Sequence, residues 1–368
     1  KTYDGPWELP EDLKHFSGFA KYGADTSFGR VEASLMSYDA RWHPTEQIPE
    51  RAIGTPVCAN AFCALDTTAE GETTRWIASA RLFGDGWRAT LYAQHYDWHM
   101  LSDPTYDFQI NQLDRRNVLG GRIERQLVRQ PRLTLTVGTE GRYDDVDRVG
   151  LQHTIGGVLG EDLGRYSAQE LSISPYAEAS WNPVDRLRLL AGARADFYSF
   201  NVTSKQDGYP GGEKNDHIFS PKLGAAYALS SNVELYANWG RGFHSNDARG
   251  VAAPLPDNDP VPGLVRGTGK ELGVRIQVGE LTLTGTYWWL EVGSELKFVG
   301  DSNSVEPSTP SRRRGYELVS FWRPLEWLAV DAVWTGSRAR AQDSAGAQFI
   351  PGAIENAGEL GIPAVRQR

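Results

Sequence analysis

The chain sorts its connections into two kinds that alternate along its length. Short turn sequences, each containing Gly, Pro or Asn, recur at even intervals: Gly84-Asp85-Gly86, Gln130-Pro131, Asn182-Pro183, Ser231-Asn232, Gly279-Glu280 and Arg323-Pro324. Between them lie long polar stretches, at 143–166, 201–216, 244–266, 300–311 and 340–352. Antiparallel strands connected in this way place the short turns at one end of a sheet and the long loops at the other. Such sorting is typical of a β-barrel that spans a membrane.

The segments between these connections alternate apolar and polar residues. In 187–197 every odd-numbered residue is Leu, Ala or Phe, and most even-numbered residues are Arg, Gly or Asp. The same pattern recurs in 233–239, 272–278 and 281–289. A period of two predicts β-strands with one apolar face and one wet face.

We predict an all-β fold, a transmembrane antiparallel up-and-down β-barrel that is incomplete, with about 15 strands present. The predicted strands are 15–24, 29–42, 73–83, 86–100, 107–128, 133–143, 166–181, 187–201, 216–229, 233–244, 265–278, 281–299, 312–323, 328–341 and 351–361. Aromatic residues gather near strand ends, as at Tyr287-Trp288-Trp289, where a membrane–water boundary favours them. The alternative is a soluble sandwich, in which the apolar faces pack against a second sheet.

Composition limits the partners of the chain. The net charge of −9 and the pI near 5.4 argue against a nucleic-acid-binding surface. No apolar run approaches the roughly 18 residues of a spanning helix, and the mean hydropathy is −0.46. A barrel gives such a mild average because lipid-facing and lumen-facing residues alternate. We therefore expect contact with a lipid bilayer and none with nucleic acid.

The two cysteines, Cys58 and Cys63, lie close together in one predicted long loop. A disulfide between them fits an exported protein in an oxidising compartment. Two unpaired thiols are the alternative.

One group of candidate ligand-binding residues lies on a single predicted strand. His95, Asp97 and His99 alternate on one face, where side chains two residues apart could converge on one ligand or ion. The alternative is a polar wall of the lumen just inside an aromatic girdle.

A second group of candidates lies where the strand 233–244 gives way to a long loop. It comprises Arg241, His244, Asn246, Asp247 and Arg249. These residues could line an outer vestibule and touch ligand, or simply form a hydrogen-bonded strand end. His244 and Asp247 alone are too few for a metal site.

We predict no catalytic residue, resident metal or cofactor. Neither the nucleophile elbow G-x-S-x-G nor the phosphate loop G-x-x-x-x-G-K-[ST] occurs. Two acidic clusters lack the spacing of a calcium-binding loop and are interpreted as solvated loops: Asp144, Asp145 and Asp147, and Asp257, Asn258 and Asp259.

Charged residues of both signs are expected on the lumen side. The alternation assigns four arginines to that side: Arg188, Arg194, Arg275 and Arg314. Carboxylates alternate with them, namely Asp196, Glu234, Glu271 and Glu317. We therefore expect these groups to neutralise one another rather than to select an anion.

Four strand motifs carry a resemblance to a known family. Residues 220–227 read S-P-K-L-G-A-A-Y, residues 236–243 read Y-A-N-W-G-R-G-F, residues 270–274 read K-E-L-G-V and residues 312–317 read R-R-R-G-Y-E. In these motifs the chain resembles TonB-dependent outer-membrane receptors, most closely over 165–345.

The resemblance implies a barrel of about 22 strands that encloses a plug and lies in the bacterial outer membrane. Residues 1–368 are expected to form part of that barrel domain, without the plug and the closing strands, as an interior piece of a longer protein. The implied function is import of a scarce ligand, such as a ferric siderophore, with energy from the inner-membrane TonB complex. The alternatives are a passive porin and a soluble β-rich binding module or glycan-active enzyme.

Overall fold

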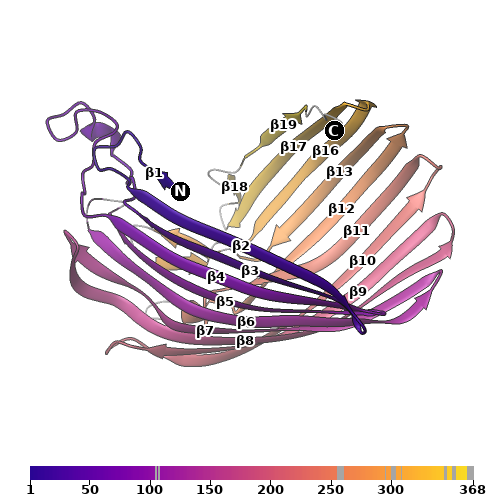
Figure 1. Cartoon of the computed structure of the whole chain (residues 1–368), viewed down its shortest axis with the longest axis horizontal. Coiled ribbons are helices and arrows are strands. Elements are labelled where there is room, and N and C mark those ends of the chain that lie inside the picture. The colour runs from indigo at the N-terminus through magenta and orange to yellow at the C-terminus, as the bar shows by residue number, and fades with distance from the viewer. Residues whose placement is uncertain are drawn as a thin grey trace.

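One antiparallel sheet of 17 strands makes up most of the protein (Figure 1). The computed structural model describes residues 1–103, 106, 108–254, 261–294, 296–299, 304–307, 309–343, 346–349 and 354–362. Within these residues, β14 (Leu296–Val299) and β15 (Ser304–Pro307) form a separate two-stranded hairpin.

The long strands follow one another in chain order, and each is hydrogen-bonded to the next. They are β2 (Leu13–Thr26), β3 (Gly29–Trp42), β4 (Glu70–Gly84), β5 (Trp87–Ser102), β6 (Gln109–Gln130), β7 (Leu133–Ile155), β8 (Val158–Val184), β9 (Leu187–Ser204), β10 (Gly212–Ala228), β11 (Val233–Ser245), β12 (Leu264–Val278), β13 (Leu281–Val292), β16 (Ser311–Leu325) and β17 (Leu328–Asp343). The predicted up-and-down order is confirmed.

Short strands complete the two edges of the sheet. β1 (Thr2–Tyr3) pairs with β2, while β18 (Gly346–Phe349) and β19 (Asn356–Gly361) both pair with β17. In the described part of the chain no strand of one edge pairs with a strand of the other, and β2 and β19 lie apart (Figure 1). The sheet is therefore an incomplete barrel wall, as predicted.

Tight turns gather at one end of the sheet and long connections at the other (Figure 1). Gly86 and Gly279 have φ of 71° and 56°, a left-handed conformation that turns of this kind require and that glycine adopts without strain.

The predicted long loop 143–166 is wrong. β7 and β8 run on through this region and meet at Gly156 and Gly157, whose φ values are 56° and 78°. The stretch reads as a loop because polar residues occupy both faces of the two strands. The predicted strand 281–299 is also interrupted, because β13 ends at Val292.

The two faces of the sheet differ sharply in exposure. Apolar side chains on one face are open to the surroundings, with Leu119 61% exposed and Leu223 55% exposed. On the other face Asp196 is 0% exposed, and its register partner Ile218 lies in a buried cluster with the helix α1 (Ala248–Ala252). We call the first face outward and the second face concave.

The outward apolar side chains form a belt. On β7, β8 and β9 they end at Tyr143, Leu171 and Phe197, and the pairings Tyr143–Leu171 and Ile173–Phe197 place these ends at nearly one level. Counted from the tight turns, each belt segment is about 11 residues long, which is the length of a transmembrane strand. Beyond this level the strands continue with polar outward residues.

The apolar face is this exposed belt, and no second sheet packs against it in the described residues. Leu235, which a sandwich would bury, is 43% exposed. No helix in the described ranges is long and apolar enough to cross a membrane.

Candidate functional site

The connection between β11 and β12 folds back over the concave face at the long-loop end. Asn246 closes its base: its backbone N–H donates to the Gly263 carbonyl at 3.0 Å, and its side-chain amide donates to the Pro262 carbonyl at 2.7 Å. The Asn246 side chain is buried, and its Oδ1 accepts no hydrogen bond within the described residues. The base of this loop is thus firmly held.

Asp247 begins the helix α1. Its carboxylate accepts a hydrogen bond from the Arg249 backbone N–H at 2.9 Å, which is the usual action of an N-cap residue. The Arg249 guanidinium also donates to both carboxylate oxygens, at 2.9 and 2.7 Å. The Asp247 side chain is 43% exposed, and its partial removal from water opposes ionisation, but the hydrogen bonds and charge of Arg249 outweigh this and hold the Asp247 pKa below its ordinary value of 3.8.

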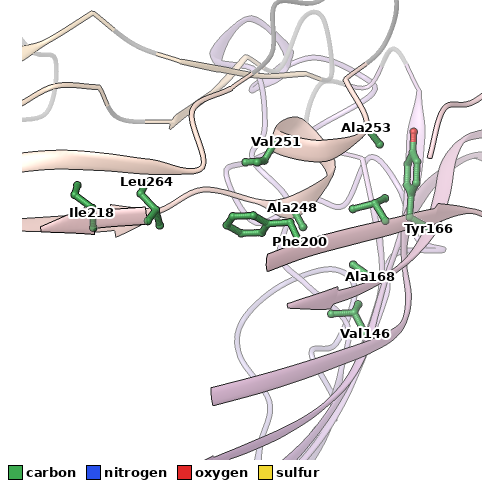
Figure 2. Close-up of a cluster of buried hydrophobic side chains, with 10 residues drawn as sticks. Val146, Tyr166, Ala168, Phe200, Ile218, Ala248, Val251, Ala253 and Leu264 are labelled. Carbon is green, nitrogen blue, oxygen red and sulfur yellow. The ribbon is translucent and has the colours of Figure 1, made fainter. Parts of the chain in front are cut away.

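Apolar contacts fix α1 against the barrel wall. Ala248 and Val251 of the helix face Phe200 of β9, which is 0% exposed, and Ala168 of β8 belongs to the same cluster (Figure 2). Tyr198 packs at its edge and meets Phe243 in a T-shaped contact with ring centroids 6.0 Å apart. This burial fixes the position of α1 in the connection between β11 and β12. We call this connection the inward loop.

A charged cluster lies on the concave face beside this loop. Arg142 binds Asp144 through two hydrogen bonds of 2.6 and 2.7 Å, and Arg116 binds Asp114 through its Nε at 2.8 Å. Glu170 of β8 pairs in register with Asp144. Glu170 lies close enough to Asp144 and Asp247 to be repelled by both, and Arg116 attracts all three carboxylates.

This concave charge cluster, which we define as Asp114, Arg116, Arg142, Asp144, Glu170, Asp247 and Arg249, is the candidate ligand-binding site. Arg116 and Arg142 each lie near more than one of its carboxylates, so an entering anion would compete with these carboxylates for an arginine. Tyr166 and Tyr198 add hydroxyl and ring surfaces nearby. No group of three or more His, Cys, Asp or Glu side chains in the described ranges could hold a metal ion.

Other concave residues neutralise one another, as predicted. Arg275 and Arg188 both approach Glu234, at 2.8 and 3.6 Å. Arg194 donates to Asp196 at 2.7 Å and to Glu140 at 3.0 Å. Arg314 is an exception, because its register partner Trp289 lies on the outward face, and its assignment to the lumen is wrong.

His95, Asp97 and His99 do not line the lumen. In the register of β5 with β6, Ala93 pairs with the exposed Leu119, and the odd-numbered residues of β5 share this outward face. The three residues lie at the outer end of the belt.

Each of these residues contacts a different neighbour. His95 Nδ1 lies 2.9 Å from Asn117 Oδ1, and its ring stacks on a tryptophan of β4. Asp97 accepts a hydrogen bond from Arg115 at 2.7 Å, whereas His99 lies 3.8 Å from Glu72. They are therefore not brought together, and a role in ligand contact is a prediction that this geometry weakens.

The remaining candidates lie in separate places. Arg241 is exposed, with its Cζ 5.8 Å from the centroid of the Trp239 ring, and His244 pairs in register with Val265. Only Asn246, Asp247 and Arg249 belong to the inward loop, and ligand contact by them stays a prediction. Cys58 and Cys63 form a disulfide, with Cα atoms 5.5 Å apart.

The expected loop cluster of Asp144, Asp145 and Asp147 lies on β7 instead, because this strand continues to Ile155. Asp257, Asn258 and Asp259 lie outside the described residues.

The sequence analysis missed Arg116, Arg142 and Glu170. A signal was nevertheless present, because an arginine and a carboxylate two residues apart share a strand face. This spacing recurs at Asp114/Arg116, Arg122/Glu124, Arg142/Asp144 and Arg194/Asp196, and each of these pairs is hydrogen-bonded.

Comparisons with known proteins agree with this architecture. The rhizobactin receptor of Rhizobium meliloti (strain 1021) is 31% identical over 101 residues, which is 23% of this chain and 14% of that protein. Among solved structures, the ferric citrate transporter FecA in its unliganded form gives a TM-score of 0.76 at 14% identity, covering 97% of this chain and 56% of that chain. The copper transporter OprC gives 0.71 at 14% identity, covering 98% and 58%.

The chain thus spans less than two thirds of the length of these receptors. Residues 15–362 match the family described as TonB dependent receptor-like, beta-barrel. This family consists of transporters of the bacterial outer membrane and not of enzymes. With nearly its whole length matched, the chain belongs to the TonB-dependent receptors, of which it forms part of the barrel domain.

Proposed function

We propose that the whole protein imports a ferric siderophore across the outer membrane, driven by the inner-membrane TonB complex. In this proposal a plug domain elsewhere in the whole protein fills the barrel and contacts TonB. Ligand would bind at the concave charge cluster, beneath the inward loop.

The observation that carries the proposal is the position of α1, which lies over the concave face and brings its Arg249 close to Asp114, with Arg116 near its N-cap Asp247. A ferric chelate with free carboxylates suits this arrangement, because arginines can bind carboxylates in a bidentate manner. The local likeness to a rhizobactin receptor supports a siderophore as the ligand. Membership of the TonB-dependent family argues against the passive porin and the soluble module.

The test measures uptake of iron-55 bound to rhizobactin by iron-starved cells that produce the full-length protein. Isogenic strains with and without TonB separate active import from diffusion. We expect saturable uptake that requires TonB. Equal uptake in both strains would show a passive channel, and failure of rhizobactin, ferric citrate and other ferric chelates to bind the purified protein would refute an iron chelate as ligand.

A pair of variants tests the site itself. Arg142→Gln removes a cation of the concave charge cluster, whereas Arg132→Gln removes a cation at a tight turn, where Arg132 pairs with Asp185 at 2.9 Å. We expect the first variant to weaken chelate binding by roughly tenfold, the effect of losing one charge-assisted hydrogen-bond pair, and the second to leave it unchanged. Equal affinities in the two variants would place the site elsewhere.

A further inference from the structure

Five register-paired residues form a row of two tryptophans and three basic side chains on the outward face, near its long-loop end. Trp239 of β11 pairs with Lys270 of β12, and Lys270 pairs with Trp289 of β13. Trp289 then pairs with Arg314 of β16, and Arg314 with Arg338 of β17. Directly paired residues of antiparallel strands share a face, so all five stand outward. We call this set the outward basic row.

The cations of this row lack the carboxylate partners found on the concave face. Lys270, Arg314 and Arg338 are exposed, and no ion pair involves them within the described part of the chain. In the adjacent register row, Glu291 lies 3.3 Å from Arg312 and is thereby neutralised. The row is therefore a local positive patch on a chain whose net charge is −9.

The row lies at the edge of the apolar belt that is nearer the long-loop end. One step closer to the tight turns, the outward residues paired across these strands are Leu272, Tyr287 and Tyr316, and Leu272 is 56% exposed. A cation at this edge extends its charged end out of the hydrocarbon, while tryptophan rings favour the interface itself. The composition of the row thus matches the headgroup level of a bilayer.

Spacing favours headgroups with more than one charge. Neighbouring strands lie about 4.8 Å apart, so Lys270 and Arg314, two strands apart, are separated by roughly 10 Å at the backbone. Guanidinium groups bind phosphate oxygens in a bidentate manner, and the intervening Trp289 offers an apolar surface to the acyl chains below.

We propose that the outward basic row binds phosphorylated lipid headgroups of the leaflet at the long-loop end of the barrel. The apolar belt directly below the row favours a lipid over an acidic protein, since a ligand held there must also contact hydrocarbon. This inference concerns the outer surface and is independent of the ligand imported through the lumen.

The test uses the full-length protein purified in a neutral detergent. Binding of bis-phosphorylated lipid A is measured by native mass spectrometry and compared with binding of dephosphorylated lipid A. The triple variant Lys270→Gln, Arg314→Gln, Arg338→Gln removes the three cations. A matched triple variant, Arg132→Gln, Arg186→Gln, Arg323→Gln, removes three exposed cations at the tight turns.

We expect wild-type protein to prefer the phosphorylated lipid, and the row variant to bind it at least about tenfold more weakly, given the attraction of each basic residue for anionic lipid. The tight-turn variant should retain wild-type binding. Equal binding of both lipids by wild-type protein, or equal losses in the two variants, would overturn the proposal.

Two further measurements separate the proposal from trivial outcomes. The heat-dependent gel shift of barrels detects whether the row variant folds. If it does not fold, the preference of the wild-type protein for phosphorylated lipid still tests the proposal, because that measurement needs no variant. Inorganic phosphate at millimolar concentration should not displace the lipid. Complete displacement by phosphate would show a free-anion site and contradict a lipid site.

Discussion

Tyrosine rings lie across glycines of neighbouring strands, and Gly273 provides a sharp test of how far these contacts stabilise the wall. Gly273 of β12 pairs in register with Tyr236 of β11. A Cβ atom at position 273 would overlap the Tyr236 ring, at a distance that real Cβ atoms essentially never show. The same arrangement recurs at Gly120 with Tyr92, and at Gly336 with Tyr316.

Tyr236 cannot move aside without loss. Its hydroxyl is 2.6 Å from Thr286 Oγ1, and the Arg275 guanidinium lies 4.5 Å from its ring centroid. Displacing the ring would forfeit a hydrogen bond of about 1 kcal/mol and a cation–π contact of about 0.5–1 kcal/mol. Overpacking adds about 1–3 kcal/mol to the destabilisation, while the loss of glycine flexibility in the unfolded chain offsets about 0.5–1 kcal/mol of it. We expect Gly273→Ala to lower the free energy of unfolding by about 3 kcal/mol.

Gly269 supplies the control on the same strand and the same face. A Cβ atom at position 269 meets nothing within 4 Å, so Gly269→Ala should stabilise the protein by about 0.5 kcal/mol. The assay is denaturant unfolding of the full-length protein in lipid vesicles, followed by tryptophan fluorescence. In a Tyr236→Ala background the cost of Gly273→Ala should vanish. Equal effects at positions 273 and 269, or an unchanged cost without the Tyr236 ring, would refute the reasoning.

Three further predictions follow from the loops and the belt. Asp247→Ala should speed hydrogen exchange in α1, because it removes an N-cap worth about 1 kcal/mol, and Asp185→Ala is the control. Because its pKa is depressed, Asp247 should stabilise α1 above pH 3.8 and lose this effect as the pH falls through its folded pKa. Protection of α1 that is unchanged in acid would contradict this prediction. Replacing Cys58 and Cys63 with Ser should destabilise their loop by about 2 kcal/mol and speed its proteolysis, while the heat-dependent gel shift of the barrel persists; loss of that shift would be the contrary result. Leu119→Arg should impair membrane assembly by about 2–4 kcal/mol, and Val57→Arg, at a loop residue with 74% exposure, should not; equal assembly of the two variants would argue against a lipid-facing belt.

The strands could be predicted from the sequence because each segment of the belt must present one face to lipid and the other to water. In 187–197 this requirement produces an alternation broken only at Leu190, and β9 begins at Leu187 as predicted. The requirement ends where the belt ends. Beyond Tyr143 both faces of β7 carry polar residues, the alternation disappears, and a strand becomes indistinguishable from a loop.

The candidate site was harder to predict because it depends on register and on bulges. Between Arg115 and Arg116 the β6–β7 register shifts, so that Arg115 pairs with Arg148 and Arg116 with Val146. The extra residue on β7 changes which of its residues face outward, and Arg148 approaches Asp97 at 3.5 Å on that side. A bulge of this kind has no signature in a single sequence.

Arg314 shows why a strand end cannot be assigned to a face by alternation alone. Residues 312–314 are all arginines, so both faces of β16 are charged at its start and the period of two gives no direction. The direction comes from Leu318, four residues further on, which is 47% exposed and shares the face of Arg314. Both proposed sites, for ligand and for lipid headgroups, lie near such ends. The residues that matter most therefore lie where alternation carries least information, and only pairing with neighbouring strands assigns them to lumen or lipid.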